Sequence, residues 1–122
     1  MMWLAVALGG ALGSIARHGV NILFSHRLLR LEPYGTPTVN ILGSLAIGLL
    51  AGWIASGRWQ VSAEMRTFLF VGILGGFTTF SSLMLDTLTL SHGGRPSAAV
   101  LNVVGQMFVG YLVIYIGFRL GV

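Results

Sequence analysis

The residues best suited to chemistry lie together at positions 75–86, which read GGFTTFSSLMLD. This stretch holds two adjacent glycines, four hydroxyl side chains and the carboxylate of Asp86, between neighbours that are mostly apolar. Adjacent glycines followed by threonines weaken a helix and permit a local break. Carbonyls freed by a break are hard oxygen ligands for a small cation, and freed N–H groups suit an anion. The stretch predicts either an ion site at a helix break or only a kinked, tightly packed helix.

The amides of Asn40, Asn102 and Gln106 are further groups that an ion could meet. Residues four apart share one face of a helix, so Asn102 and Gln106 lie on one stripe. Such a stripe can line a narrow anion route, but amides at this spacing also bond one helix to another. Asn40 follows a helix start indicated by Gly35 and Pro37, and it allows the same two interpretations.

The elements that must position these residues are membrane-spanning helices. The chain has 122 residues, 55% of them hydrophobic and 8% charged, and its mean hydropathy is +0.86. This is far more apolar than a soluble domain of this size. A spanning helix needs about 20 mostly apolar residues, and four segments provide them, at 2–25, 36–56, 67–91 and 97–118.

These segments predict an all-α protein of the cell membrane with one four-helix transmembrane domain over residues 1–122, whose third helix is broken near its middle. We expect no enzyme, because no nucleophile, base and orienting group can be assembled. Cysteine is absent, so disulfides and thiolate metal sites are excluded. Small residues at four-residue spacing predict close helix packing, at Gly9 and Gly13, at Ser44, Gly48 and Gly52, at Gly72 and Gly76, and at Gly117 and Gly121.

The basic residues are seven arginines without lysine, scattered singly, so no nucleic-acid partner is expected. Four spans place three arginines on one side (Arg58, Arg66 and Arg119) and three on the other (Arg27, Arg30 and Arg95). Orientation follows an excess of basic residues in short cytoplasmic loops. The balance predicts insertion in both orientations and an antiparallel two-fold dimer, unless another determinant, such as the first span, fixes one orientation.

Two charged residues stand at or near membrane depth. Arg17 lies towards the far end of the first span, where it either snorkels to the interface or places a positive charge beside a water-filled vestibule. Asp86 is the one carboxylate within a predicted span. An intramembrane carboxylate is a functional candidate, although Asp86 is close enough to the end of its span to reach a vestibule.

Three ordered motifs resemble the fluoride ion channel family, known as Fluc or CrcB. They are GGALGSIARHG at 9–19, GTPTVNILGSLAIG at 35–48 and GGFTTFSS at 75–82, and the resemblance extends over all four spans. It implies a passive fluoride-selective channel that exports fluoride from the cytoplasm through the inner membrane of a bacterium or archaeon. It also implies an antiparallel dimer of two copies with two pores.

The same resemblance assigns roles to individual residues. The backbone carbonyls of Gly75 and Thr78 would bind a structural sodium ion at the dimer centre, and Arg17 would be a vestibule or structural arginine. Phe80 would be a pore phenylalanine beside the pore-lining amide of Asn40, because an aromatic ring is positive at its edge and holds an anion weakly enough to release it. The anion-facing wall would also include the hydroxyls of Thr79, Ser81 and Ser82.

The sequence departs from the family pattern at two places. Leu83 stands where a second pore phenylalanine is usual, and Asn102 and Gln106 replace a tyrosine or serine track on the fourth span. Either amides replace the second ring in the ion pathway, or the chain pairs with a homologous subunit and supplies part of a pore.

Two other functions remain open from the sequence. A small multidrug-type, proton-coupled exporter needs a buried carboxylate, ordinarily in the first span, and that span has none. Only Asp86 could serve instead. A non-conducting assembly subunit would be consistent with the small-residue stripes and with Leu83.

Overall fold

The computed structural model describes residues 1–25 and 34–122, so Arg27 and Arg30 lie outside the described residues. All regular elements of the described part are helical. They are α1 (Met2–Phe24), α2 (Gly35–Ala55), α3 (Ala63–Arg66), η2 (Thr67–Leu74), α4 (Gly75–Phe77), α5 (Phe80–His92) and α6 (Pro96–Gly121). Ser62 starts α3 by accepting a hydrogen bond from the N–H of Met65 at 3.2 Å. Pro96 occupies the first turn of α6, where its missing N–H costs nothing.

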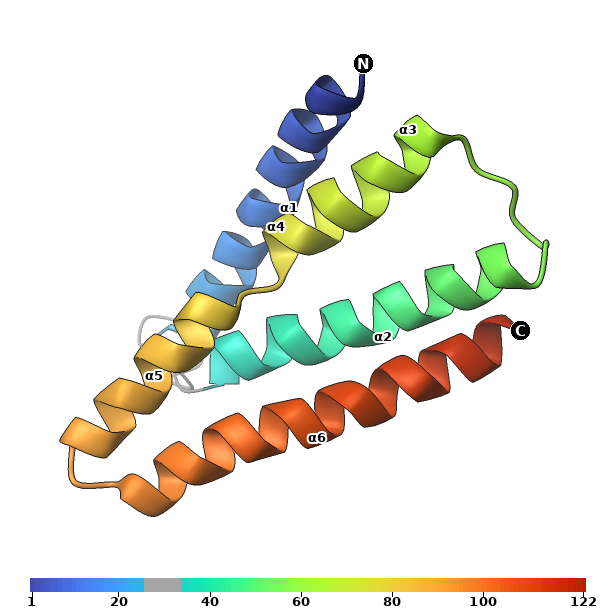
Figure 1. Ribbon diagram of the computed structural model, residues 1–122. Coiled ribbons are helices and arrows are strands. Elements are labelled where there is room, and N and C mark those ends of the chain that lie inside the picture. The colour runs from blue at the N-terminus through green and yellow to red at the C-terminus, as the bar shows by residue number, and fades with distance from the viewer. Residues whose placement is uncertain (26–33) are drawn as a thin grey trace.

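The segments from α3 to α5 form one long rod with a break between α4 and α5 (Figure 1). Within it, η2 is a π-helix, in which the N–H of Gly75 reaches back five residues to the carbonyl of Phe70. A tight turn through Gly93 and Gly94 reverses the chain into α6, and Gly94 adopts a positive φ of 74° there. The fold therefore contains two parallel helix pairs, α1 with η2 and α2 with α6, joined through the broken rod (Figure 1).

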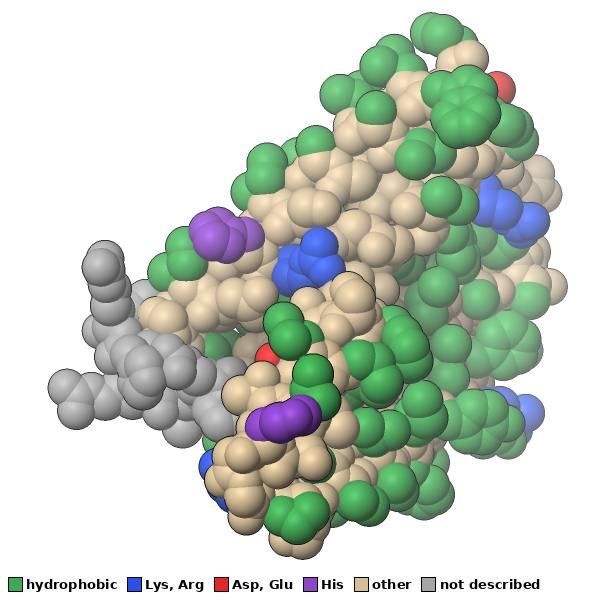
Figure 2. All heavy atoms as spheres, turned by 60° about the vertical axis from the view of Figure 1, so that its left-hand side comes forward, with side chains coloured by type: hydrophobic (Ala, Val, Ile, Leu, Met, Phe, Trp, Pro, Cys, Tyr) green, Lys and Arg blue, Asp and Glu red, His purple; other side chains and the backbone are tan. Residues whose placement is uncertain are grey.

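Within residues 1–25 and 34–122, three helices are long and apolar enough to cross a membrane: α2, the rod Ala63–His92 and α6. The first helix, α1, is not among them, since Arg17 and His18 lower its hydropathy. Few large apolar side chains are buried, whereas Leu101 is 72% exposed and Tyr111 75% exposed. Apolar side chains cover much of the face in Figure 2. Such a surface suits lipid or another apolar partner, and the chain is a multi-pass membrane protein.

Glycines bring the backbones of each helix pair into contact, as their spacing predicts. A Cβ on Gly117 or Gly121 of α6 would lie 2.6 Å from the carbonyl oxygen of Leu45 or Leu49 in α2. In the other pair, a Cβ on Gly76 would lie 2.7 Å from the carbonyl oxygen of Gly10. Real Cβ atoms do not approach this closely, so these positions accept no larger residue without separating the helices.

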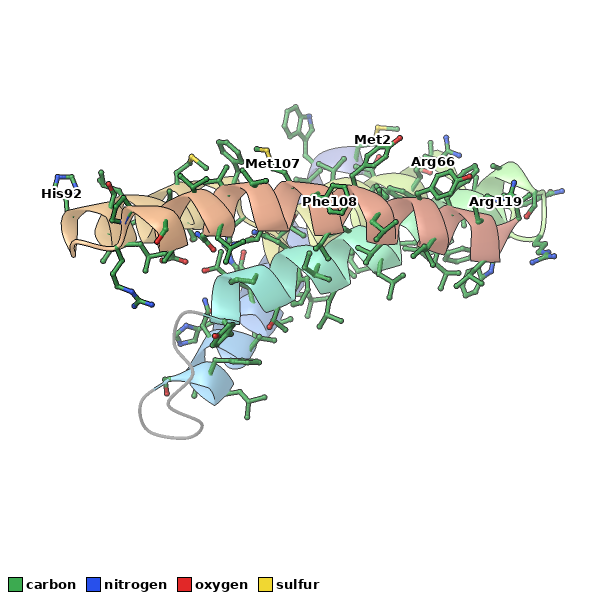
Figure 3. All side chains as sticks on the ribbon, turned by 90° about the horizontal axis from the view of Figure 1, so that it is seen from below. Met2, Arg66, His92, Met107, Phe108 and Arg119 are labelled. Atoms are coloured by element: carbon green, nitrogen blue, oxygen red, sulfur yellow. The ribbon has the colours of Figure 1, made fainter. Side chains whose placement is uncertain are left out.

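Arginine and histidine side chains mark the two ends of the molecule. Figure 3 shows Arg66 and Arg119 at one end and His92 at the other. At the first end, Ser56 Oγ and Arg58 Nη1 donate to the carbonyl of Gly121 at 3.1 and 3.3 Å, so the loop after α2 covers the end of α6. Because a cation near the last carbonyls of a helix is favourable, these contacts hold α2 and α6 in register.

Candidate ion site at the helix break

The break confirms the prediction of an interrupted third helix, but it lies two residues beyond the glycine pair. Gly75 and Gly76 are helical, whereas Thr78 and Thr79 are extended, with φ values of −83° and −155°. Thr78 ends the first half, because its N–H and its hydroxyl both donate to the carbonyl of Leu74, at 3.0 and 2.9 Å. Thr79 starts the second half by accepting from the N–H of Ser82 at 3.2 Å.

The amide of Asn40, on α2, satisfies the extended backbone of Thr79. Its Oδ1 accepts from the Thr79 N–H at 2.8 Å, and its Nδ2 donates to the Thr79 carbonyl at 3.0 Å. One side chain thus replaces two bonds that a continuous helix would make. The break is therefore held by a contact between α2 and the rod, and Asn40 is central to the site.

A row of polar side chains continues from Asn40 through α6 and back to α5. Asn40 Nδ2 also donates to Gln106 Oε1 at 2.8 Å, and Gln106 Nε2 donates to Asn102 Oδ1 at 2.9 Å. Asn102 Nδ2 donates to the hydroxyl of Thr87 at 3.0 Å, which donates to the carbonyl of Leu83 at 2.7 Å. We call these four side chains, of Asn40, Gln106, Asn102 and Thr87, the amide relay.

Thr87 was not predicted as a site residue, although its position in the sequence indicates that it faces Asn102. The helices α5 and α6 form a hairpin whose turn is at Gly93 and Gly94. In an antiparallel hairpin, residues equally far from the turn face each other. Thr87 is therefore opposite Asn102, and by the same count Leu83 is opposite Gln106.

A hollow of about 360 Å³ opens beside the break, and we call it the break hollow. Seven of the residues expected at the site line it: Asn40, Gly75, Thr78, Thr79, Phe80, Leu83 and Gln106. Phe80 is 64% exposed and presents its ring outside the bundle, whereas Leu83 is 4% exposed and belongs to the core. Ser44, from the small-residue stripe of α2, adds a hydroxyl to the lining.

Four other expected residues lie away from the break hollow. Asn102 is behind Gln106 in the relay. Ser82 accepts from the hydroxyl of Thr79 at 3.0 Å, and Ser81 is exposed with its Oγ 3.4 Å from the same hydroxyl. Asp86 is half-buried further along α5. The stretch from Thr79 to Ser82 thus caps the N-terminus of α5, and the aromatic ring of Phe80 lies on its outer side.

Arg17 reaches the break from α1. Its Nη1 donates to the carbonyl of Thr78 at 3.4 Å, a long contact, and the side chain is half-buried. This places the guanidinium at the break itself. In this single chain, Arg17 thus shares the Thr78 carbonyl that was expected to bind sodium.

The backbone at the break has the donor chemistry that a sodium ion requires. The Thr79 N–H, which would close the helical bond to the Gly75 carbonyl, donates to Asn40 instead, so that carbonyl is left available. Within the described residues no three carboxylate or imidazole side chains gather, so a cation here would depend on carbonyl oxygens. The carbonyl oxygens of Gly75 and Thr78 are of the kind that a sodium ion takes, and Arg17 donates to that of Thr78.

The sequence is similar to proteins of known name over almost its whole length. It is 47% identical over 119 residues to the fluoride-specific ion channel FluC of Thermus thermophilus, covering 98% of this chain and 94% of that protein. The proteins of the same name from Paracoccus denitrificans and Hyphomonas neptunium are 47% and 45% identical, covering 98% and 94% of this chain and 93% and 91% of their own lengths. Together with the apolar helices of this chain, these relatives indicate a multi-pass protein of the cell membrane.

Residues 4–118 match the family described as CrcB-like protein, Camphor Resistance (CrcB). This match includes most of α1, the break and the relay, and it agrees with the three sequence motifs that resembled the same family. The chain belongs to the CrcB family.

Proposed function

We propose that this protein is a passive, fluoride-selective channel that lets fluoride leave the cytoplasm, and that it is not an enzyme. The observation that carries the proposal is the break hollow, where amides and the ring of Phe80 meet at a hydrogen-bonded helix break. Relatives at 47% identity carry the name fluoride-specific ion channel. Ring edges and amide N–H groups attract a small anion without the strong binding of a full positive charge, which conduction requires.

An antiparallel dimer with two pores is the assembly that best suits this chain. Phe80 faces outwards and the break hollow is open on that side, so one chain supplies only part of the wall of a pore. A second copy, related by a two-fold axis, supplies the rest and doubles the number of hollows. In this assembly α1, with 23 residues, is the fourth span beside η2. A homologous subunit in place of the second copy is the alternative.

In this dimer, the carbonyls of Gly75 and Thr78 and those of the second copy would hold a central sodium ion. The ion would supply a fixed charge that holds the two breaks together. The proposed ion pathway comprises Asn40, Thr79, Phe80, Ser81, Ser82, Leu83, Asn102 and Gln106, and Asp86 would flank a vestibule. Arg17 would be a structural arginine, because it donates to the Thr78 carbonyl at the break. Leu83 forms an apolar wall opposite Gln106. A proton-coupled exporter is less well supported, because α1 has no acidic residue and Asp86 does not line the break hollow.

The direct test is fluoride efflux from liposomes that contain the purified protein alone. A fluoride electrode should record efflux down the gradient far faster than from empty liposomes, and chloride-loaded liposomes should release almost nothing. Efflux no faster than from empty liposomes would rule out a channel made of identical chains. Recovery of efflux on adding a homologous subunit would then identify a heteromeric channel.

Orientation can be tested cleanly because the chain has no cysteine. Gln60→Cys places one exposed thiol in the loop before α3, and Ser91→Cys places one at the other end of the rod. If the chain inserts in both orientations, a membrane-impermeant thiol reagent outside right-side-out vesicles should label about half of each variant. Each variant is the control for the other, since a single orientation would label one fully and leave the other unlabelled.

A further inference from the structure

The amide relay has a defined direction, because a backbone group of fixed character stands at each end. At one end the Thr79 N–H can only donate, so the atom of Asn40 that meets it must be the oxygen. The Asn40 nitrogen then donates to Gln106, whose nitrogen donates to Asn102. At the other end the carbonyl of Leu83 can only accept. Every amide between these ends is thereby oriented the same way.

This direction decides which hydrogen-bonding group the relay offers to the break hollow. Asn40 Nδ2 has two N–H groups, and both are used, by the Thr79 carbonyl and by Gln106. Gln106 Nε2 also has two, and within the described part of the chain only one is used, by Asn102. Gln106 lines the break hollow together with Phe80. Of the two amides that line the hollow, Gln106 is therefore the one with an N–H available to an anion.

The orientation of Gln106 is fixed by Asn40 at one end of the relay and supported from the other end by Thr87, which does not itself line the break hollow. The Thr87 hydroxyl has one hydrogen, which it donates to Leu83, so towards Asn102 it can only accept. This fixes the Asn102 oxygen towards Gln106. Without the hydroxyl, Asn102 Nδ2 loses its acceptor and Asn102 is held by Gln106 alone, so the amide of Gln106 is fixed only at its Asn40 end.

We propose that Thr87 is a positioning residue, which acts through Asn102 to hold the amide of Gln106 so that it presents an N–H to an anion in the break hollow. The proposal rests on the proposed channel function. It assigns direct contact with the anion to Gln106 and a supporting role to Asn40. An amide held at one end only keeps its N–H directed at the anion less well, and the anion is then bound more weakly.

The test compares two threonines of α5 that differ in one contact. Thr87 and Thr89 each donate a hydroxyl to the carbonyl four residues earlier, at 2.7 and 2.9 Å, but only Thr87 also accepts from Asn102. Initial efflux is measured from liposomes at graded internal fluoride. Thr87→Val should raise the half-saturating fluoride concentration by roughly three- to tenfold, the effect of one net hydrogen bond. Thr89→Val and the conservative Thr87→Ser should match the original protein.

The possible outcomes distinguish the role of Thr87 from the channel function itself. Equal half-saturation for Thr87→Val and Thr89→Val, while the unaltered protein conducts fluoride, would overturn the role of Thr87 alone. The same shift in Thr87→Ser as in Thr87→Val would show that the effect does not follow the hydroxyl, and it would also overturn the role of Thr87. No fluoride efflux from the unaltered protein would overturn the channel function and this inference together.

A measurement on the unaltered protein covers the case in which Thr87→Val does not fold. Fluoride added to ¹⁵N-labelled protein in lipid nanodiscs should shift the side-chain amide resonance of Gln106 more than that of Asn40. A larger shift at Asn40 would contradict the assignment of the free N–H to Gln106.

Discussion

Asn40→Asp should slow fluoride efflux by roughly a hundredfold or more, because it leaves two buried acceptors without donors at ~1–3 kcal/mol each. The carboxylate can still accept from the Thr79 N–H, but it cannot donate to the carbonyl of Thr79 or to Gln106. It also places a negative charge beside the route of an anion. The measurement is efflux from liposomes with a fluoride electrode, on variant protein whose elution volume in size-exclusion chromatography is unchanged.

Thr38→Val is the matched control for this substitution. Thr38 is on the same helix, and its hydroxyl donates only locally, to the carbonyl of Tyr34 at 2.6 Å. Its loss should leave efflux close to that of the original protein. Efflux by folded Asn40→Asp at the rate of Thr38→Val would remove Asn40 from both the break and the pathway.

Gly13→Ala should destabilise the protein by ~2 kcal/mol or more, whereas Gly10→Ala on the same helix should cost nothing or stabilise it by up to ~1 kcal/mol. A Cβ on Gly13 would collide with the carbonyl oxygen of Ile73 and lie 2.9 Å from the N atom of Phe77. Because these are backbone atoms, α1 and the rod would have to separate. A Cβ on Gly10 meets nothing within 4 Å in this chain.

The measurement is the midpoint of thermal unfolding in detergent. Unfolding is monitored as the fraction of heated protein that still elutes as folded protein in size-exclusion chromatography. Equal midpoints for the two variants would contradict the close packing of α1 against the rod. A loss of dimer with Gly10→Ala, at an unchanged unfolding midpoint, would show instead that the second copy covers Gly10.

The position of the break illustrates what a sequence can and cannot predict. The glycine pair indicated that the third helix would be interrupted, and it is, but at Thr78 and Thr79. Low helix propensity shows where a break costs little free energy. The position at which the helix actually breaks depends on which residue can satisfy the freed backbone groups. Asn40, distant in sequence, does this for Thr79. Gly76 stays helical because it packs against Gly10.

The sequence predicted which residues form the site better than it predicted how they are arranged. Asn40, Phe80 and Gln106 were all expected, and they line one hollow. Their division of roles could not be read from the sequence, since the two donors of Asn40 are used only once the rod and α6 are in place. Leu83 was identified as a departure from the family pattern. Its burial opposite Gln106 depends on the hairpin of α5 and α6.

The π-helical segment η2 bears on how this protein tolerates changes in length. A π turn takes up more residues than an α turn, so η2 contains surplus chain within the rod. Two contacts follow η2 in the chain: Gly76 must meet α1, and Thr79 must meet Asn40. Loss of one residue from 67–74 can be absorbed by a return to α-helical bonding, with both contacts preserved. A deletion between Gly76 and Thr79 cannot be absorbed in this way, because no surplus residue lies there. Length variation among natural variants should therefore occur in η2 and be absent from the break.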